Sequence, residues 1–138
     1  MLPDDILLNK ASIIERCIIR IQEEYTACPT LDNFTHVDAL VLNIERACQA
    51  AIDMAMHLVA ENRYGIPQSS AHAFILLSDN NIIPKKLAES LQNMVGFRNL
   101  VVHNYQELDQ AILAFVIEKG YIDFIVFCNT LGIKIAEK

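Results

Sequence analysis

The amino-acid sequence predicts an all-α protein, an antiparallel helical bundle of about five helices that forms a single domain over residues 1–138. Apolar residues recur at helical spacing along almost the whole chain. The apolar-polar alternation of a half-buried strand is not sustained over any useful length. A chain of 138 residues can bury one substantial core but is short for two.

The first two helices are predicted from an apolar stripe and from the signals that bound it. The stripe comprises Ile6, Leu7, Ile14, Cys17, Ile18, Ile21 and Tyr25. It ends at Cys28-Pro29-Thr30, because proline disfavours helical geometry in the residue before it. Thr35-His36-Val37-Asp38 resembles a capping box with Asp in the usual place of Glu, so the second helix is expected to begin there. It should run to about Arg63 and end at Tyr64-Gly65-Ile66-Pro67.

A short third helix is predicted over residues 71–78, where Ser69-Ser70 can cap its start and Asn80-Asn81 can end it. Pro84 suits the first position of a fourth helix that runs to roughly Val102.

Three glycines bear on the later helices. Gly96 lies inside the fourth helix, where glycine costs roughly 1 kcal/mol relative to alanine, so close packing of another helix is expected there. The last helix should start near Asp109 and run to the C-terminus, with bends or breaks at Gly120 and Gly132.

The composition is unusually apolar for a small soluble monomer, with 53% hydrophobic residues and a mean hydropathy of +0.27. This surplus suggests an apolar face for a partner, most simply a second copy. A membrane span is not expected, because the most apolar region, 111–128, is interrupted by Glu118, Lys119 and Asp123. The acidic start of the chain does not resemble a signal peptide, so a cytoplasmic protein is expected.

Charge and cysteine content narrow the function classes. The net charge of −6 argues against broad, non-specific binding of nucleic acid, but only weakly against a small active site. Cys17, Cys28, Cys48 and Cys128 are scattered without metal-ligand spacing, so neither structural zinc nor disulfides are expected. No metal or other cofactor is predicted.

The segment around Arg98, Asn99, His103 and Tyr105 carries most of the functional information, and it reads R-x4-H-x-Y. Arginine offers a planar, permanently charged fork for phosphate oxygens, and histidine exchanges protons near neutral pH. Arg98 and His103 are five positions apart, which on a helix is about 140° of rotation. Two arrangements can bring them to one phosphate: the helix ends before His103 and its ring turns back, or the groups meet counterparts from a second subunit.

A purely structural reading of the same residues remains open. Arg98 can pair with a carboxylate on a neighbouring helix, and His103 can be a cation favoured by a helix C-terminus. Tyr105 can pack at a helix-to-loop junction with its hydroxyl at the surface. Taken alone, R-x4-H is a weak pattern.

The wider sequence resembles the HepT-like toxin ribonucleases of the HEPN superfamily. Besides the motif, the resemblance rests on four segments in order, and it covers most of the chain. These are Asp53-Met54-Ala55-Met56-His57-Leu58, Gly65-Ile66-Pro67, Phe74-Ile75-Leu76-Leu77 and Met94-Val95-Gly96-Phe97-Arg98-Asn99.

The resemblance implies a homodimeric, metal-independent endoribonuclease, the toxin of a type VII-like toxin–antitoxin pair, with two motifs facing each other across the dimer. Arg98 and His103 then carry the chemistry, and Asn99 supports them by orienting the phosphate or the histidine. Tyr105 matches the position at which a cognate, MntA-like nucleotidyltransferase antitoxin transfers AMP. The expected partners are therefore RNA, a second copy of the chain and the antitoxin. The homodimer and the antitoxin can together form a larger hetero-oligomer. Asn104 departs from the acidic residue that many family members have there, which leaves the charge around His103 open.

Two other readings compete with the nuclease. A non-catalytic accessory subunit of a minimal nucleotidyltransferase suits the acidic charge, and a plain helical dimerisation module would make the motif structural.

Among the remaining polar residues, Asp53 and His57 are spaced to face each other on the second helix. They are most simply a structural pair, and support of the site is the alternative. Glu45 and Asp53 share a helical face that is interpreted as an ordinary helix-pairing surface.

Overall fold

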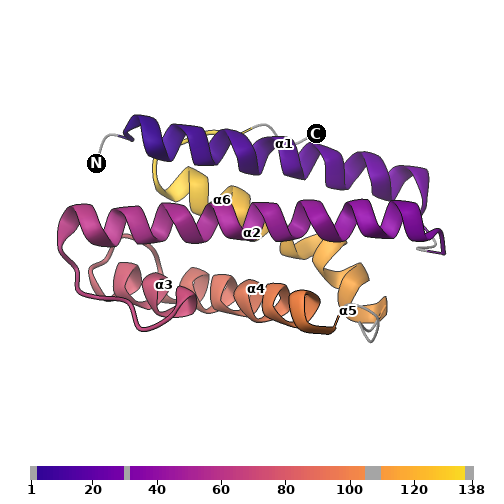
Figure 1. Ribbon diagram of the computed structural model, residues 1–138. Coiled ribbons are helices and arrows are strands. Elements are labelled where there is room, and N and C mark those ends of the chain that lie inside the picture. Colours follow the sequence, from indigo (N-terminus) through magenta and orange to yellow (C-terminus); the bar gives the residue numbers. More distant parts are fainter. Residues whose placement is uncertain (1–2, 30–31, 105–109, 136–138) are drawn as a thin grey trace.

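A computed structural model of the chain describes residues 3–29, 32–104 and 110–135, with the backbone alone at 34, 101–104 and 110–112. Helices α1 (Asp5–Ala27) and α2 (Phe34–Asn62) form a long antiparallel hairpin that spans the molecule (Figure 1). Helices α3 (Ser70–Asp79) and α4 (Lys85–Asn104) follow one another along the other side of α2. The predicted all-α bundle is confirmed.

The C-terminal helix predicted as one element is a path of three pieces. These are α5 (Gln110–Phe115), the π-helix η2 (Val116–Gly120) and α6 (Ile122–Thr130). The break falls at Gly120, as expected, and Gly120 is buried: a Cβ added there would lie 3.1 Å from Met94 Sδ of α4. Helix α6 contacts both α2 and α4 and so closes the bundle behind the hairpin (Figure 1).

The core forms where the apolar faces of these helices meet. The predicted stripe of α1 is largely buried, although Ile6 is exposed and Tyr25 only partly covered. The ring of Phe74 in α3 packs edge-to-face on Phe127 in α6, with centroids 5.6 Å apart. All four cysteines are buried free thiols. Within the described ranges, no helix is both long and apolar enough to cross a bilayer.

The start of α2 differs from the prediction. Asn33 caps the helix, because its Oδ1 accepts hydrogen bonds from the backbone N–H groups of Thr35 at 3.0 Å and His36 at 3.4 Å. Thr35 is therefore inside the first turn, and the expected capping box is wrong. Asparagine is at least as good an N-cap residue as threonine. Asn33 precedes Thr35 in the chain, and the helix begins after Asn33.

The expectation of close packing at Gly96 is also wrong within this chain. Gly96 is exposed, and a Cβ built on it would meet nothing within 4 Å. The glycine therefore faces open space on α4.

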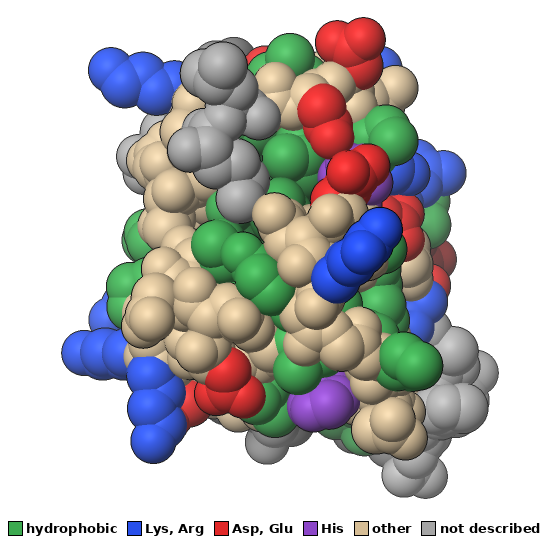
Figure 2. Space-filling view, turned by 90° about the vertical axis from the view of Figure 1, so that its left-hand side faces the viewer, with side chains coloured by type: hydrophobic (Ala, Val, Ile, Leu, Met, Phe, Trp, Pro, Cys, Tyr) green, Lys and Arg blue, Asp and Glu red, His purple; other side chains and the backbone are tan. Residues whose placement is uncertain are grey.

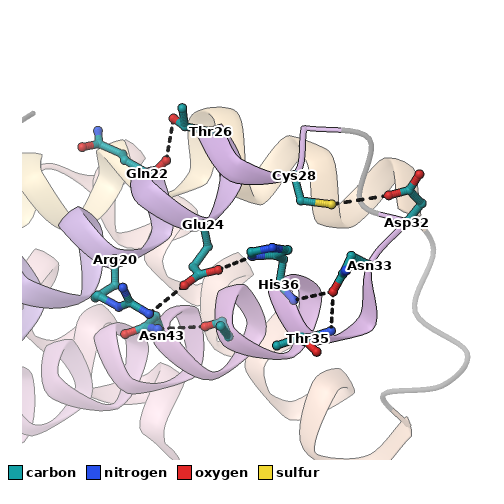
Figure 3. A network of polar contacts seen from close by, with 11 residues as sticks. Arg20, Gln22, Glu24, Thr26, Cys28, Asp32, Asn33, Thr35, His36 and Asn43 are labelled. Atoms are coloured by element: carbon teal, nitrogen blue, oxygen red, sulfur yellow. Dashed lines mark hydrogen bonds and ion pairs between the residues drawn. The ribbon is translucent and has the colours of Figure 1, made fainter.

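Polar contacts join α1 and α2 beside the loop that connects them (Figure 3). Glu24 of α1 accepts from Arg20 on its own helix, with Oε1 2.7 Å from Nη2. Its Oε2 lies 2.5 Å from Nδ1 of His36 in the first turn of α2. The hydrogen bond from His36 is the largest cause that lowers the pKa of Glu24 below its usual range, and the charge of Arg20 adds to it. We call these three residues the hairpin clamp.

Helix α6 ends in a Schellman turn. The backbone N–H of Ile133 donates to the carbonyl of Cys128 at 2.9 Å, and that of Gly132 to Asn129 at 3.0 Å. This geometry places Gly132 at φ +84°, in the left-handed region that side chains avoid.

Replacing Gly132 should therefore destabilise the fold. For Gly132→Ala we expect a loss of about 1–2 kcal/mol in the free energy of unfolding, because a Cβ is crowded in left-handed backbone. Gly132→Asn should lose clearly less, since asparagine tolerates this conformation. Urea unfolding of the three proteins gives the comparison, and equal stabilities would contradict the role assigned to the turn.

The hairpin clamp should make stability depend on pH. Because the pKa of Glu24 is lowered in the folded state, its stabilising contribution is present above the ordinary value of 4.5 and is lost as pH falls through the folded pKa. Glu24→Gln should reduce the difference in stability between pH 7 and pH 3. Glu23→Gln, an exposed neighbour outside the clamp, is the matched control. Identical pH profiles for all three proteins in thermal unfolding would refute the assignment.

Candidate active site

Helix α4 carries both Arg98 and His103, because it continues to Asn104. The alternative in which the helix ends before His103 is therefore wrong. On a continuous helix the two positions differ by about 140° in direction and about 7.5 Å along the axis. They cannot face one phosphate from the same side of the helix. The side chain of His103, and all of Tyr105, lie outside the described residues.

Arg98 packs toward α2. Its guanidinium is close enough to Cys48 to lower the pKa of that thiol, against the larger effect of burial, which raises it to about 12. The carboxylate of Glu45 acts in the same direction as burial. The Nε atom of Arg98 is buried and has no hydrogen-bond partner among the described residues. A buried donor without a partner is costly, so an acceptor bound at this atom would be stabilising.

One face of α4 has no cover from the rest of the described chain. We call it the open face, and it comprises Gly96, Asn99 and Leu100, of which Leu100 is 43% exposed. The position of His103 continues the same row, since residues three, four and seven apart share a helical face. The predicted supporting residue Asn99 is thus on the side of His103, while Arg98 lies on the neighbouring side.

The expected pairing of Asp53 with His57 is wrong, because Asp53 binds Lys10 of α1 and a residue of its own helix, while His57 binds the N-cap of α1. Lys10 Nζ lies 3.1 Å from Asp53 Oδ2, and Gln49 donates to Asp53 Oδ1 at 2.9 Å. His57 Nε2 lies 2.5 Å from Oδ2 of Asp4, the N-cap of α1. The spacing within α2 showed only that Asp53 and His57 can meet, whereas α1 supplies better-placed partners.

Asp4 and His57 also belong to a group with possible metal-ligand geometry that sequence reasoning missed. The donor atoms of Asp4, His57 and Glu61 all lie within 4.8 Å of one another. Figure 2 views this end of the bundle, where acidic side chains gather near a histidine. His57 is about 13 Å along α2 from Cys48, which Arg98 approaches, so the group is remote from the candidate site.

Comparison with known proteins shows which family this chain resembles in sequence. The model of the family described as ribonuclease HepT-like matches residues 13–131. An mRNA nuclease HepT from Shewanella oneidensis is 42% identical over 129 residues, which cover 93% of this chain and 97% of that protein. A tRNA nuclease HepT from Aphanizomenon flos-aquae is 34% identical over 61 residues, which cover 44% of this chain and 42% of the relative.

A solved structure agrees over nearly the whole chain. It is the tri-AMPylated HEPN toxin of Shewanella oneidensis in complex with its MNT antitoxin. The match has a TM-score of 0.89 and 41% identity and covers 94% of this chain and 98% of that one. The fold, the position of the motif on α4 and these likenesses agree: the chain belongs to the HepT-like ribonuclease family.

Proposed function

We propose that this protein is the ribonuclease of a toxin–antitoxin pair and cuts RNA without a metal ion. The observation that carries the proposal is the arrangement on α4. Arg98 is held against α2 with an unmet donor, and the position of His103 lies on the adjoining open face. The family membership supports the same activity.

The proposed reaction is an attack by an RNA 2′-hydroxyl on the neighbouring phosphodiester. The imidazole of His103 accepts the hydroxyl proton as the O2′–P bond forms. The P–O5′ bond then breaks, and the departing 5′-oxygen receives a proton from a second imidazole or from water. Arg98 stabilises the negative charge that develops on the phosphate oxygens, and Asn99 orients the phosphate or the histidine. The products are a 2′,3′-cyclic phosphate and a 5′-hydroxyl.

A homodimer completes the site in this proposal. Arg98 and His103 point about 140° apart on one helix, so a second copy is the simplest source of the complementary group. The open face of α4 offers the surface, because Gly96 allows a helix to approach and Leu100 is an exposed apolar contact. Residues 1–138 act as one domain, and we place the reaction in the cytoplasm, where four free thiols stay reduced.

Control by a nucleotidyltransferase antitoxin is the second part of the proposal. The antitoxin transfers AMP to Tyr105, two residues after His103. The added phosphate and base would occupy the place of RNA and neutralise Arg98. The structure of a relative, an AMPylated HEPN toxin with its MNT antitoxin, supports this, and a larger hetero-oligomer is the expected assembly.

One observation favours a different function. The net charge of −6 suits an accessory subunit that regulates the nucleotidyltransferase without cutting RNA. Such a subunit would not cleave RNA, and this separates the two functions by experiment.

Cleavage of RNA in the presence of EDTA should depend on both motif residues. Arg98→Ala should lower the rate about 10²–10³-fold, as for loss of one group that stabilises transition-state charge. His103→Ala should lower it about 10²–10⁴-fold through loss of proton transfer. Arg46→Ala and His72→Ala, at partly or fully exposed positions elsewhere, are the matched controls. A folded His103→Ala protein with undiminished cleavage would remove His103 from the mechanism.

Mixed dimers test whether the site is shared. Arg98→Ala and His103→Ala subunits, each inactive alone, should regain about a quarter of wild-type activity when they are unfolded together and refolded. Half of the dimers are then mixed, and each has one intact composite site. If the mixture stays inactive although mixed dimers are detected by native mass spectrometry, the two residues act within one subunit.

Modification of Tyr105 should be visible as added mass. Coexpression with the cognate nucleotidyltransferase should add AMP units to the wild-type protein and to Tyr64→Phe, and abolish their cleavage of RNA. Tyr105→Phe should keep its unmodified mass and remain active. Modified Tyr105→Phe, or an unmodified wild type beside a competent transferase, would contradict regulation at this position.

A further inference from the structure

A recess lies between the last turns of α1 and the π-helix η2. Its volume is about 310 Å³, and it opens to solvent. The lining residues are Gln22, Tyr25 and Thr26 of α1, with Ile117, Glu118 and Tyr121 from the C-terminal segment. None of these residues has a role in the proposed reaction.

The π-helix η2 forms part of one wall of this recess. A π-turn holds one residue more than an α-turn, and such turns are frequent at functional sites. Here Gly120 lets the turn sit against Met94 of α4, which leaves Glu118 and Tyr121 directed at α1. The Tyr25 hydroxyl donates to Glu118 Oε1 at 2.5 Å, and this bond across the mouth fixes the carboxylate.

The recess offers hydrogen-bond acceptors. A carboxylate such as that of Glu118 accepts hydrogen bonds, and its second oxygen has no donor among the described residues. Gln22 donates through Nε2 to the Tyr121 hydroxyl at a long 3.5 Å, and its buried Oε1 has no partner in the part of the chain that the structure describes. The described residues that line the recess include no lysine or arginine, so they disfavour a phosphate.

The ligand that fits is flat and carries neighbouring N–H donors. The rings of Tyr25 and Tyr121 provide aromatic surface of the kind on which unpaired RNA bases stack. Guanine presents two adjacent donors, N1–H and the N2 amino group, which match the two oxygens of one carboxylate. Adenine and cytosine each present a single amino group on that edge, and uracil a single N–H.

The position of the recess relates it to the candidate active site. Met94, which contacts the Gly120 turn, precedes Arg98 by one turn of α4, about 6 Å along the axis. The C-terminal ends of α1 and α4 lie at the same end of the bundle (Figure 1). An RNA strand held at Arg98 can therefore extend toward the recess.

We propose that Glu118, Tyr25, Tyr121 and Gln22 form a subsite that binds an unpaired guanine of the RNA near the cleaved phosphodiester. The inference rests on the proposed ribonuclease function and adds a base preference to it. Glu118 accepts from the Watson–Crick edge of guanine, a tyrosine ring stacks on the base, and Gln22 reorients to use its unmet oxygen.

Mapping of cleavage sites in a random-sequence RNA pool tests the preference. The wild type should show guanine at a fixed distance from the cut, and Glu118→Gln should reduce that enrichment about 10-fold or more. Glu118→Gln should weaken cleavage of guanine-containing RNA through KM and not through kcat, because Glu118 binds the base and touches no reacting atom. Glu23→Gln, the same change at an exposed site on α1 outside the recess, should leave the preference intact. A wild type without base preference, or with a preference unchanged in Glu118→Gln, would overturn the subsite.

Binding measured without cleavage separates this inference from the proposed function. In the His103→Ala background, fluorescence anisotropy can compare an RNA that has guanine at the mapped position with one that has inosine, which lacks the N2 amino group. Guanine should bind about 10-fold more tightly, and Glu118→Gln should remove the difference. Equal affinities would refute the guanine subsite and leave the nuclease assignment standing. A wild-type protein that does not cleave RNA would refute the nuclease assignment itself.

Discussion

The packing of α4 on α2 and α6 is the constraint on which the candidate site depends. Met94, Val95 and Phe97 are buried, and they set the rotation of α4 about its axis. Once that rotation is set, helical geometry dictates the direction of every other residue on α4. Arg98 must lie toward Cys48, and Gly96, Asn99 and Leu100 must face outward. The reactive groups are therefore placed by apolar neighbours in the sequence.

Much of this could be predicted because it follows from local periodicity. The buried stripe of α1, the Ser69 cap of α3 and the break at Gly120 each depend on residues close together in sequence. Partners from other helices could not be predicted in this way. His57 was expected to face Asp53, but its partner Asp4 is 53 positions away in the chain. The sequence pattern also could not show that Gly96 faces open space. A glycine inside a helix permits the close approach of another helix but does not show that one is present in the same chain.

Charge is the point at which composition and structure have to be reconciled. The chain is acidic overall, yet several of its carboxylates make specific hydrogen bonds or ion pairs. Glu24 joins two helices, Asp53 binds Lys10, and Glu118 holds the Tyr25 hydroxyl. An acidic wall can contact RNA where it meets base edges, because these carry N–H donors, and only the phosphates need cations. A protein with net negative charge can thus bind a single strand through a few positions while it rejects duplexes.

The π-helix gives this part of the chain a tolerance that the other helices lack. Its wider turn takes up one residue more than an α-turn, within 116–120. The residues that follow, among them the buried Phe124 and Phe127, therefore keep nearly the direction that a regular α-helix one residue shorter would give them. One residue can be lost from this segment while the core side of α6 stays buried, and the walls of the recess would change instead. A deletion inside α4 has no such absorber and would rotate everything after it on the helix by about 100°.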